Sequence, residues 1–510
     1  MSDNVRVRFA PSPTGPLHMG GVRTALYNYL FAKSNGGDFI LRVEDTDEKR
    51  FVTGAQDYIL ESLKWCGIEP NEGVGYGGEF GPYVQSERKD LYKEYAEQLL
   101  ESGQAYMAFD TPDDLETMRK QAQEMGLANW QYNGVTRSSM KNSLSLSKEE
   151  VDKRLANGDP YTIRFKMPRN VDVKFEDEIR GWVTVNTNNL DDKVLYKETG
   201  MPTYHMANII DDHLMEITHV IRGEEWLPSA PLHVLLYEAM GWEAPKFAHL
   251  PLILRPDGNG KLSKRDGDRL GFPVFPLNWT TAEGELYSGY KEAGYFPEAF
   301  VNMLAFLGWN PGTNDEIFSL EELVKSFTLE RVGKSGARFD PDKTKWFNQT
   351  YLRNKSDEEL AELLASTMEG DYDTGYLAMV CSMMKERASF VEDIKADGDY
   401  FFTKEIKDYD AKTVRKKWKE DSSEIMNDLI NNFKEIEDWN AGELERAFSE
   451  YLTKNEYGFG KVGPCFRLLV TGKGMGPSMF DICEALGKDL VLDRMIEGIP
   501  KVESLKSAEA

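Results

Sequence analysis

The feature that most constrains this fold is an apolar segment followed by a turn rich in proline and glycine. Val5–Phe9 is apolar and strand-like, and Ala10–Gly21 (APSPTGPLHMGG) follows it directly. The prolines fix φ and remove backbone donors, so the strand must end there. Gly20 and Gly21 let the backbone approach a ligand, and from Val22 onward apolar residues recur at helical spacing. The segment therefore predicts a βα unit. Its helix N-terminus can bind an anion, because free N–H groups and the helix dipole face the ligand.

The first 95 residues alternate between strand and helix patterns. A second strand is expected at Phe39–Val43 and a helix through Ala55–Leu63, and Pro82–Arg88 opens a further helix. This alternation predicts an α/β fold with a doubly wound parallel sheet, whose ligand lies at the C-terminal ends of the strands. Glu44–Asp47 ends the second strand, so we expect carboxylates at the same rim.

A basic loop far along the chain can bind the same phosphate ligand as this turn. Arg255–Gly267 contains Lys261-Leu262-Ser263-Lys264-Arg265, with glycines at both ends that predict mobility and three cations that predict a polyphosphate partner. His18 in the first turn can donate to an α-phosphate oxygen, and Lys264 can neutralise charge on a leaving pyrophosphate. The alternatives are a histidine that only caps its helix and a basic loop that is only solvated. Because both segments occur in one chain, we interpret them as a two-sided clamp for ATP.

Length and composition exclude several classes of protein. At 510 residues the chain is long enough for several domains. No apolar stretch approaches membrane-spanning length, and no signal pattern opens the chain. Scattered cysteines without a CxxC pair predict a reducing cytoplasm and no disulfide framework: Cys66, Cys381, Cys465 and Cys483. The formal net charge of −25 bears on solubility and steering, so it does not exclude RNA binding through local basic stripes.

From about residue 96 the pattern changes. Charged helical stretches give way to short strands at Tyr161–Met167 and Trp182–Val185, which indicates an insertion between two halves of the nucleotide fold. We expect the sheet to resume at Tyr204–Asp212 and Glu216–Arg222. Beyond Lys345 the spacing is almost wholly helical, which predicts a separate α-helical domain.

Polar residues of these segments form a second candidate site. Arg8 and Arg222 can each bind a carboxylate through two parallel hydrogen bonds. Tyr204 and Asn208 lie one helical turn apart, or else on one face of a strand, and can supply neutral polar contacts. Glu44 can pair with an ammonium group. Each residue alone is typical of an ion pair or a cap, but all of them map to one rim and so predict an amino-acid site.

These segments resemble the bacterial type of glutamyl-tRNA synthetase, a class I aminoacyl-tRNA synthetase family. The His18 turn resembles the HIGH signature, and Lys261–Arg265 resembles the KMSKS signature. The phrases RFAPSPTG, RVEDTD, PTYHMAN, DDHLMEITHVIRGEEW and KLSKR occur in the family's order and spacing over the first two-thirds of the chain. The resemblance implies a Rossmann-type catalytic domain in two halves (1–95 and 201–250), an inserted α+β acceptor-binding domain (96–200), a stem-contact domain with the ATP loop (251–345) and an all-α anticodon-binding domain (346–510).

The resemblance also implies a set of site residues. For ATP these are Pro11, Ser12, Thr14, His18, Gly20, Gly21, Lys261, Leu262, Ser263, Lys264 and Arg265, with His18, Lys261 and Lys264 as the catalytic residues. For glutamate they are Arg8, Ser12, Glu44, Tyr204, Asn208 and Arg222, and Trp226 matches a residue near the adenylate. Arg222 matches the arginine that selects the side-chain carboxylate over the amide of glutamine, while the division of the two carboxylates between Arg8 and Arg222 stays open.

The chemistry implied is that of a glutamate–tRNA ligase. The glutamate α-carboxylate attacks the α-phosphate of ATP to give glutamyl-adenylate and pyrophosphate, and the terminal ribose of tRNA(Glu) then attacks the acyl carbon and releases AMP. No protein nucleophile is needed, so positioning and charge stabilisation would carry catalysis. We expect Mg²⁺ to bridge ATP phosphates rather than sit in a protein cage. We also expect a cytoplasmic monomer with no membrane partner. Use of tRNA(Gln) and a requirement for tRNA during activation stay open.

Three departures from the family pattern matter. Gly21 replaces the last histidine of the first signature, as is common among glutamyl enzymes. Tyr106–Phe109 carries no cysteine where some relatives have a zinc site, so we expect no structural zinc. Leu270–Trp279 is longer and more apolar than the family pattern. This segment either covers the hinge of the ATP loop or pads the stem-contact domain, and we favour padding.

The C-terminal third contains two basic segments that can contact RNA, and two other classes of protein are the alternatives. Arg415–Lys419 can contact phosphates or bases, although a solvated helix face explains it equally well, and Lys461–Gly472 resembles the family's helical anticodon cage. The length argues against a paralogue that glutamylates a queuosine base. A catalytically dead RNA-binding paralogue would not need intact His18, Lys264 and Arg222. A nucleotidyltransferase that makes a cofactor would not need the glutamate set.

Overall fold

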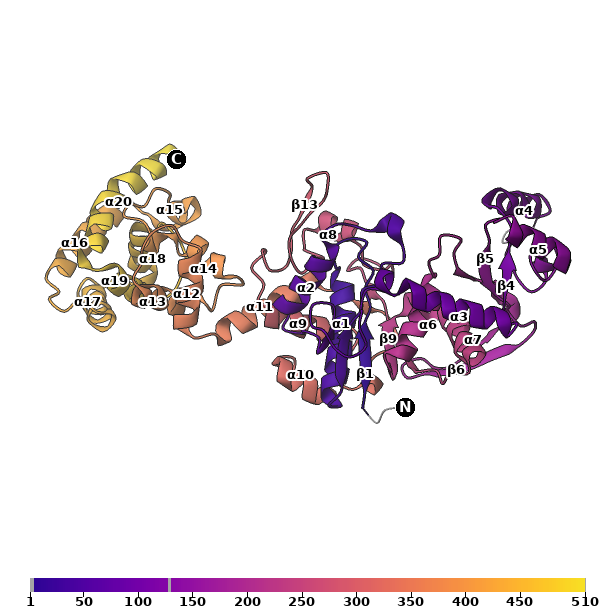
Figure 1. Ribbon diagram of the computed structural model, residues 1–510. Coiled ribbons are helices and arrows are strands. Elements are labelled where there is room, and N and C mark those ends of the chain that lie inside the picture. The colour runs from indigo at the N-terminus through magenta and orange to yellow at the C-terminus, as the bar shows by residue number, and fades with distance from the viewer. Residues whose placement is uncertain (1–3, 127–129, 510) are drawn as a thin grey trace. The chain divides into compact units, whose positions relative to one another are not determined.

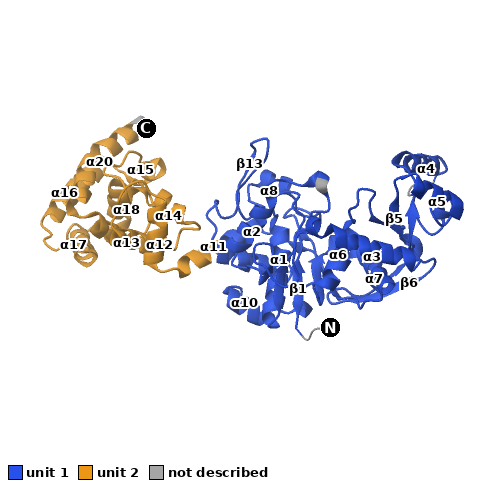
Figure 2. Cartoon of the chain, viewed as in Figure 1, with its two compact units in different colours: residues 1–347 blue, residues 348–510 orange. Residues whose placement is uncertain are grey.

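The computed structural model describes residues 4–126 and 130–509, which form two compact units divided between residues 347 and 348 (Figures 1 and 2). The first unit contains every strand found in the described residues. The second unit is helical. In the described residues no helix has both the length and the apolarity that crossing a membrane requires.

A seven-stranded sheet forms the centre of the first unit. Its strand order is β3-β2-β1-β9-β10-β6-β7, with bounds β3 (Glu72–Gly73), β2 (Asp38–Leu41), β1 (Arg6–Phe9), β9 (His219–Gly223), β10 (Lys246–Leu250), β6 (Asp172–Asp177) and β7 (Gly181–Asn186). The pairs from β3 to β6 are parallel, and only β6 and β7 are antiparallel. The chain leaves β1 toward β2 on one side and reaches β9 on the other, so the order reverses between β1 and β9. Sheets of this kind bind ligands at such a crevice. The α/β fold class is confirmed.

Helices cover the sheet and complete the core. They are α1 (Met19–Ser34), α2 (Ala55–Trp65), α3 (Lys89–Glu101), α6 (Tyr204–Leu214), α7 (Ala230–Met240), α9 (Pro297–Ala305) and α10 (Leu320–Ser326). Helix α1 packs on β1, β2 and β9 and is covered in turn by α9 and α10 (Figure 1). Val22, Leu26 and Leu30 of α1 are completely buried, and burying each such side chain contributes about 1.5–3 kcal/mol relative to exposure.

The expected strand at Tyr204–Asp212 is wrong, because this segment is helix α6. Every residue from Met206 to Asp212 is buried, so the apolar pattern lacks an exposed face that would reveal its period. A short run of this kind cannot be assigned from periodicity alone. Of the two arrangements left open for Tyr204 and Asn208, the helical turn is the correct one.

The inserted region differs from the predicted range 96–200. A separate antiparallel sheet of β4 (Ala105–Ala108), β5 (Thr162–Phe165) and β8 (Val194–Tyr196) carries α4 (Pro112–Glu124) and α5 (Lys148–Ala156). The hairpin β6–β7 lies inside the same range of sequence but extends the seven-stranded sheet. Phe175 of β6 packs edge-on against Phe247 of β10, with ring centroids 5.8 Å apart. Contacts between residues so distant in sequence leave no local signal.

The segment Arg255–Gly267, expected to be a loop throughout, ends in a helix. Residues 255–260 form a tight turn after β11 (Ile253–Leu254), because Arg255 N–H donates to Gly260 O and Leu262 N–H to Ile253 O. Lys264 and Arg265 then open helix α8 (Lys264–Leu270), which is capped by Ser263 and Asp266. A short hairpin follows, β12 (Trp279–Thr280) with β13 (Leu286–Tyr287), and β14 (Ala337–Arg338) pairs with β11.

The second unit is a set of helices without strands in its described residues. Helix α11 (Pro341–Asn354) contains the boundary. It is followed by α12 (Asp357–Ser366), α13 (Thr374–Met384), α14 (Val391–Asp397), α15 (Ala411–Lys417), α16 (Ser422–Lys434), α17 (Ala441–Lys454), α18 (Phe459–Thr471), α19 (Met479–Leu486) and α20 (Lys488–Glu509). In the basic cluster of α15 Trp418 is buried, so it is not available to stack on a base. Arg415, Lys416 and Lys417 are exposed.

Candidate active site

One cavity of about 420 Å³ lies at the carboxyl ends of β1 and β9 and the start of α1. It gathers most of the predicted site residues: Arg8, Pro11, Ser12, His18, Gly20, Gly21, Glu44, Tyr204, Asn208, Arg222, Trp226, Lys261, Leu262, Ser263 and Lys264. Thr14 lines a neighbouring cavity that shares Pro11, Ser12, His18 and Lys264 with the first. Arg265 is exposed and lines neither cavity, so the structure does not bring it into the site.

His18 caps helix α1 through one ring nitrogen, and its side chain also lines the cavity. Its Nδ1 accepts a hydrogen bond from the Gly20 N–H at 3.1 Å, so the ring caps α1. Burial and the nearby Lys261 lower the pKa of His18 to about 4, so the ring is neutral near pH 7. Its one proton therefore lies on Nε2. That nitrogen is buried and has no partner among the described residues, which leaves a donor available to a ligand. The structure shows this histidine as a helix cap through Nδ1, while a contact between Nε2–H and a phosphate stays a prediction.

The two glycines of the turn have different roles. A Cβ at Gly21 would lie 2.5 Å from Leu17 Cδ1, so a larger residue there would require the Leu17 side chain to move. A Cβ at Gly20 would meet nothing closer than His18 Nδ1 at 3.5 Å. Gly20 lines the cavity, so its missing side chain instead leaves room for a ligand near the first turn of α1.

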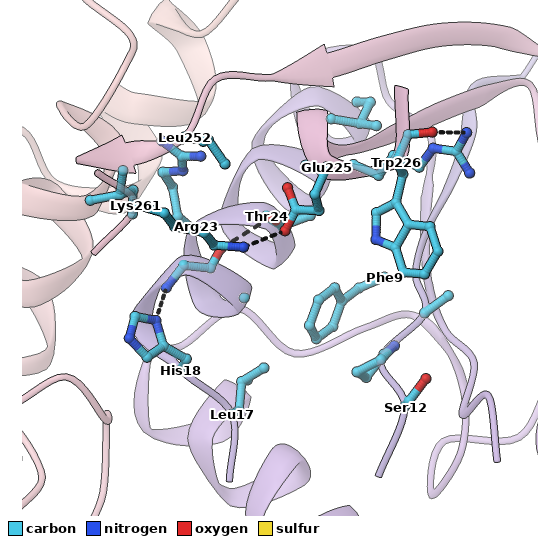
Figure 3. Close-up of a pocket in the computed structure, with 18 of the residues that line it drawn as sticks. Phe9, Ser12, Leu17, His18, Arg23, Thr24, Glu225, Trp226, Leu252 and Lys261 are labelled. Carbon is cyan, nitrogen blue, oxygen red and sulfur yellow. Dashed lines mark hydrogen bonds and ion pairs between the residues drawn. The ribbon is translucent and has the colours of Figure 1, made fainter. Parts of the chain in front are cut away.

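Both lysines of the basic loop have partners in the protein. Lys261 Nζ lies 2.9 Å from Glu225 Oε1, although its side chain is 57% exposed. Figure 3 shows Lys261, Glu225 and His18 around the same space. Lys264 Nζ lies 3.1 Å from the ring centroid of Tyr287, a cation–π contact with the hairpin β12–β13. Because both contacts are partly exposed, each is weak enough for a more negatively charged ligand to replace it.

The long apolar segment after the loop lies beside the turn that precedes α1. The Met19 N–H donates to Val274 O at 2.8 Å, and the rings of His18 and Phe275 meet edge to face at 6.0 Å. Tyr58 of α2 donates to Leu277 O at 2.6 Å. The segment therefore packs against the start of α1 and against α2, and its role as padding or as a cover of the loop hinge stays a prediction.

A buried network of charges holds one wall of the cavity. Arg42 Nη2 lies 2.9 Å from Glu44 Oε1 and its Nη1 2.8 Å from Asp212 Oδ1. Arg8 Nε lies 2.9 Å from the same Asp212 oxygen, and Asn208 donates to Glu44 at 3.0 Å. Burial raises the pKa of Glu44 against the effect of both arginines. Asp212 is also buried, but Arg8 and Arg42 lower its pKa.

Arg222 differs from the other arginines of this wall. It is 5% exposed, and no carboxylate of the described residues lies within ion-pair distance of it. Its neighbours are neutral acceptors: Tyr204 Oη at 3.0 Å, His249 Nε2 at 3.1 Å, His233 Nδ1 at 3.4 Å and Trp226 O at 3.4 Å. A buried guanidinium without a direct counterion makes a carboxylate the ligand that best fits this position. The ring of Trp226 contacts that of Tyr204 in a tilted arrangement, with centroids 4.3 Å apart.

Several residues of the site were missed at the level of sequence. Glu225 and Tyr287 hold the two lysines, Asp212 holds Arg8, and His249 contacts Arg222. Asp212 and Glu225 belong to segments already identified. Pairing each predicted cation of the site with a carboxylate from those segments would have pointed to them. Tyr287 and His249 carry no such signal. The four cysteines are free and buried, and in the described residues no three His, Cys, Asp or Glu side chains are grouped to hold a metal ion.

Comparisons with known families agree with this geometry. The family described as tRNA synthetases class I (E and Q), catalytic domain, matches residues 4–346. A family described as anticodon binding domain matches residues 359–499. Together the two matches cover both compact units.

Relatives of known name cover nearly the whole chain. A glutamate–tRNA ligase of Christiangramia forsetii is 56% identical over 503 residues, which is 98% of this chain and 99% of the relative. The enzyme of the same name from Bacteroides fragilis is 55% identical over 96% of this chain and 97% of its own.

Solved structures give the same result. A glutamate tRNA ligase from Elizabethkingia meningosepticum, crystallised in complex with its amino acid, superposes with a TM-score of 0.95 at 50% identity, over 98% of this chain and 100% of that one. The glutamate-tRNA synthetase of Elizabethkingia anophelis superposes with a TM-score of 0.92 over the same shares. The chain therefore belongs to the glutamate–tRNA ligase family of class I aminoacyl-tRNA synthetases.

Proposed function

We propose that this protein activates L-glutamate with ATP and transfers it to the 3′ end of tRNA(Glu). The observation that carries the proposal is a single cavity that joins both ATP signatures to an arginine without a carboxylate partner. Membership of the glutamate–tRNA ligase family and the similarity to an enzyme crystallised with its amino acid support it.

Glutamate would bind along the wall that holds the buried charges. Arg222 would receive the side-chain carboxylate, since its Nη nitrogens contact only neutral oxygen and nitrogen atoms. The ammonium group would pair with Glu44, whose pKa is raised by burial and would fall again beside a cation. Arg8 has two terminal nitrogens that make no hydrogen bond within the described residues, and they are the candidates for the α-carboxylate.

ATP would bind between the first turn of α1 and the basic loop. His18 Nε2–H would donate to the α-phosphate, and Lys261 and Lys264 would leave Glu225 and Tyr287 to contact the departing pyrophosphate. The α-carboxylate forms the new bond to the α-phosphorus while the bond to pyrophosphate breaks. Imidazole and ammonium groups suit phosphate oxygens but are poor ligands for a hard dication, so Mg²⁺ would be held mainly by the phosphates of ATP.

The second unit would bind the anticodon arm of the tRNA. The anticodon-binding match over residues 359–499 supports this role, together with exposed cations in the last turn of α15. Acceptance of tRNA(Gln) would depend on a few contacts to anticodon bases. We also propose that the protein is a monomer.

Aminoacylation with labelled glutamate tests the proposal directly. Purified tRNA(Glu) and tRNA(Gln) transcripts are charged side by side, and pyrophosphate exchange is measured with and without tRNA. Charging of tRNA(Glu) alone indicates a discriminating ligase, and charging of both indicates a non-discriminating one. Charging of neither transcript at any salt concentration would contradict the proposed function.

A further inference from the structure

The contact between Arg222 and His249 continues into a chain of buried polar groups that the proposed reaction does not use. His249 is completely buried in β10, and Asp177 at the end of β6 is 1% exposed. Asp177 Oδ2 lies 2.6 Å from His249 Nδ1, and Arg222 Nε lies 3.1 Å from His249 Nε2. His249 and Asp177 do not line the cavity, so they act only through Arg222.

The protonation of His249 follows from its neighbours. Arginine has donors and no acceptor, so His249 Nε2 must accept from Arg222 and carries no proton. The proton of the neutral ring is then on Nδ1 and is donated to Asp177. Burial and the charge of Arg222 lower the pKa of His249, while the hydrogen bond to Asp177 opposes that shift. The neutral Nδ1–H tautomer is therefore the state that satisfies all three residues.

This arrangement gives Arg222 a counterion without blocking the edge of the guanidinium that would bind a substrate carboxylate. A carboxylate in direct contact with Arg222 would occupy the edge that the substrate needs. An imidazole between the two charges uses only the Nε of Arg222 and keeps the counterion one ring away. The Nη nitrogens stay with neutral partners, of which Tyr204 Oη is the nearest at 3.0 Å.

We propose that Asp177 and His249 are positioning residues that orient Arg222 and thereby set the preference for the glutamate carboxylate over the glutamine carboxamide. This inference rests on the proposed function, because it assigns the glutamate side chain to Arg222. It adds one residue from β6 and one from β10 to the specificity of the enzyme.

The substitution Asp177→Asn is a sharp test, because the backbone fixes the orientation of the new amide. Asp177 Oδ1 accepts from the N–H groups of Ile179, Arg180 and His249 at 3.1, 2.9 and 3.3 Å. An asparagine must keep its oxygen there, so its NH₂ group faces His249 Nδ1. That nitrogen then has to accept, the ring proton moves to Nε2, and a donor faces the Arg222 guanidinium.

The expected result is a selective loss of glutamate binding. A misplaced hydrogen bond to a charged group corresponds to about a ten- to hundredfold rise in KM for glutamate. The KM for ATP and the kcat at saturating glutamate should stay within about twofold, and the ratio of glutamate to glutamine charging should fall. Asp172→Asn is the matched control, because Asp172 lies on the same strand, is exposed and bonds only Asn186 in the described residues. It should behave like the unmodified enzyme.

Each outcome decides between defined alternatives. If the unmodified enzyme charges no glutamate, the proposed function fails first. If it does, and Asp177→Asn has an unchanged KM for glutamate or loses kcat and ATP affinity to the same degree, the positioning role is overturned. If the variant does not fold, the nitrogen NMR shifts of the unmodified enzyme decide, with six histidines to assign. A neutral Nδ1–H ring at His249 supports the proposal, and an Nε2–H ring or an imidazolium refutes it.

Discussion

The proposed glutamate side and the proposed ATP side of the cavity are built in different ways. On the glutamate side Arg8, Glu44 and Arg222 are 3–5% exposed and are held by buried partners from several strands and helices. On the ATP side Lys261 and Lys264 contact Glu225 and Tyr287 near the surface. One half is fixed before the substrate arrives, and the other half is held by contacts that a ligand can replace.

The difference matches what each substrate requires. Selecting a carboxylate over an amide of the same shape depends on a fixed electrostatic environment, which is effective only where water and side-chain motion are excluded. The charge on ATP moves from the triphosphate to the departing pyrophosphate during the reaction, so groups that stabilise it must be free to follow. The comparison predicts large effects on the fixed side and graded effects on the adjustable side.

The largest expected effect comes from Arg222→Ala. Two charge-assisted hydrogen bonds of about 1.5–3 kcal/mol each would be lost, which lowers kcat/KM for glutamate by about 10²–10⁴. Pyrophosphate exchange at increasing glutamate concentration measures the change. Arg50→Ala is the control, because Arg50 is exposed and pairs only with Asp47 among the described residues. Unchanged glutamate use by Arg222→Ala would refute the division between a fixed and an adjustable half.

Lys264→Ala should act on the ATP side alone. Removing one group that stabilises the developing charge lowers kcat by about 10²–10³, while the KM for glutamate stays unchanged. Steady-state kinetics of pyrophosphate exchange give both quantities. A rise in the KM for glutamate comparable to the loss in kcat would mean that the two halves are not independent.

Acid should destabilise the protein through His18. The folded-state pKa is about 4 and the unfolded value about 6.5, so between these values the unfolded chain binds more protons. Stability is therefore complete above about pH 6.5 and falls as the pH decreases toward 4, by up to about 3 kcal/mol. His18→Gln keeps a polar side chain but cannot gain this proton. Unfolding by urea at pH 7 and pH 4.5 should show a smaller acid-induced loss for the variant, and an equal loss would contradict the assignment.

The smallest effect is expected at the cation–π contact. Tyr287→Leu removes the ring that holds Lys264, so ATP no longer competes with it, and the KM for ATP should fall about two- to fivefold. Tyr287→Phe keeps the ring and should match the unmodified enzyme. Leu286→Ala, at an exposed neighbouring position, is the control. Equal changes for leucine and phenylalanine would assign the effect to the hydroxyl instead.

Local chemistry made part of this molecule predictable. Prolines and glycines determine the turn after β1 without help from the rest of the fold, and the regular apolar spacing of α1 and α2 is a local property. The same holds for the helical second unit. Most of the predicted site residues converge on one cavity because the carboxyl ends of neighbouring parallel strands share an edge.

What could not be predicted depends on residues that meet from distant parts of the chain. Helix α6 was assigned as a strand because burial on all sides hides its period. The β6–β7 hairpin pairs with β10 through a single register position, Phe247 opposite Asp177. The contact between Asp177 and His249 spans 72 residues, and that between Lys264 and Tyr287 depends on the path of a hairpin with no marked pattern.

The pairing of β1 with β9 also constrains how the protein is made. Val7 and His219 lie side by side in the sheet, so a ribosome that has made the first strand must add about 210 more residues before the partner strand emerges. At 5–20 residues per second this takes roughly 10–40 s, during which one edge of β1 has no strand to pair with. Open strand edges promote aggregation. The nascent chain is therefore most vulnerable while the inserted region is being translated, and any pause there lengthens the exposure.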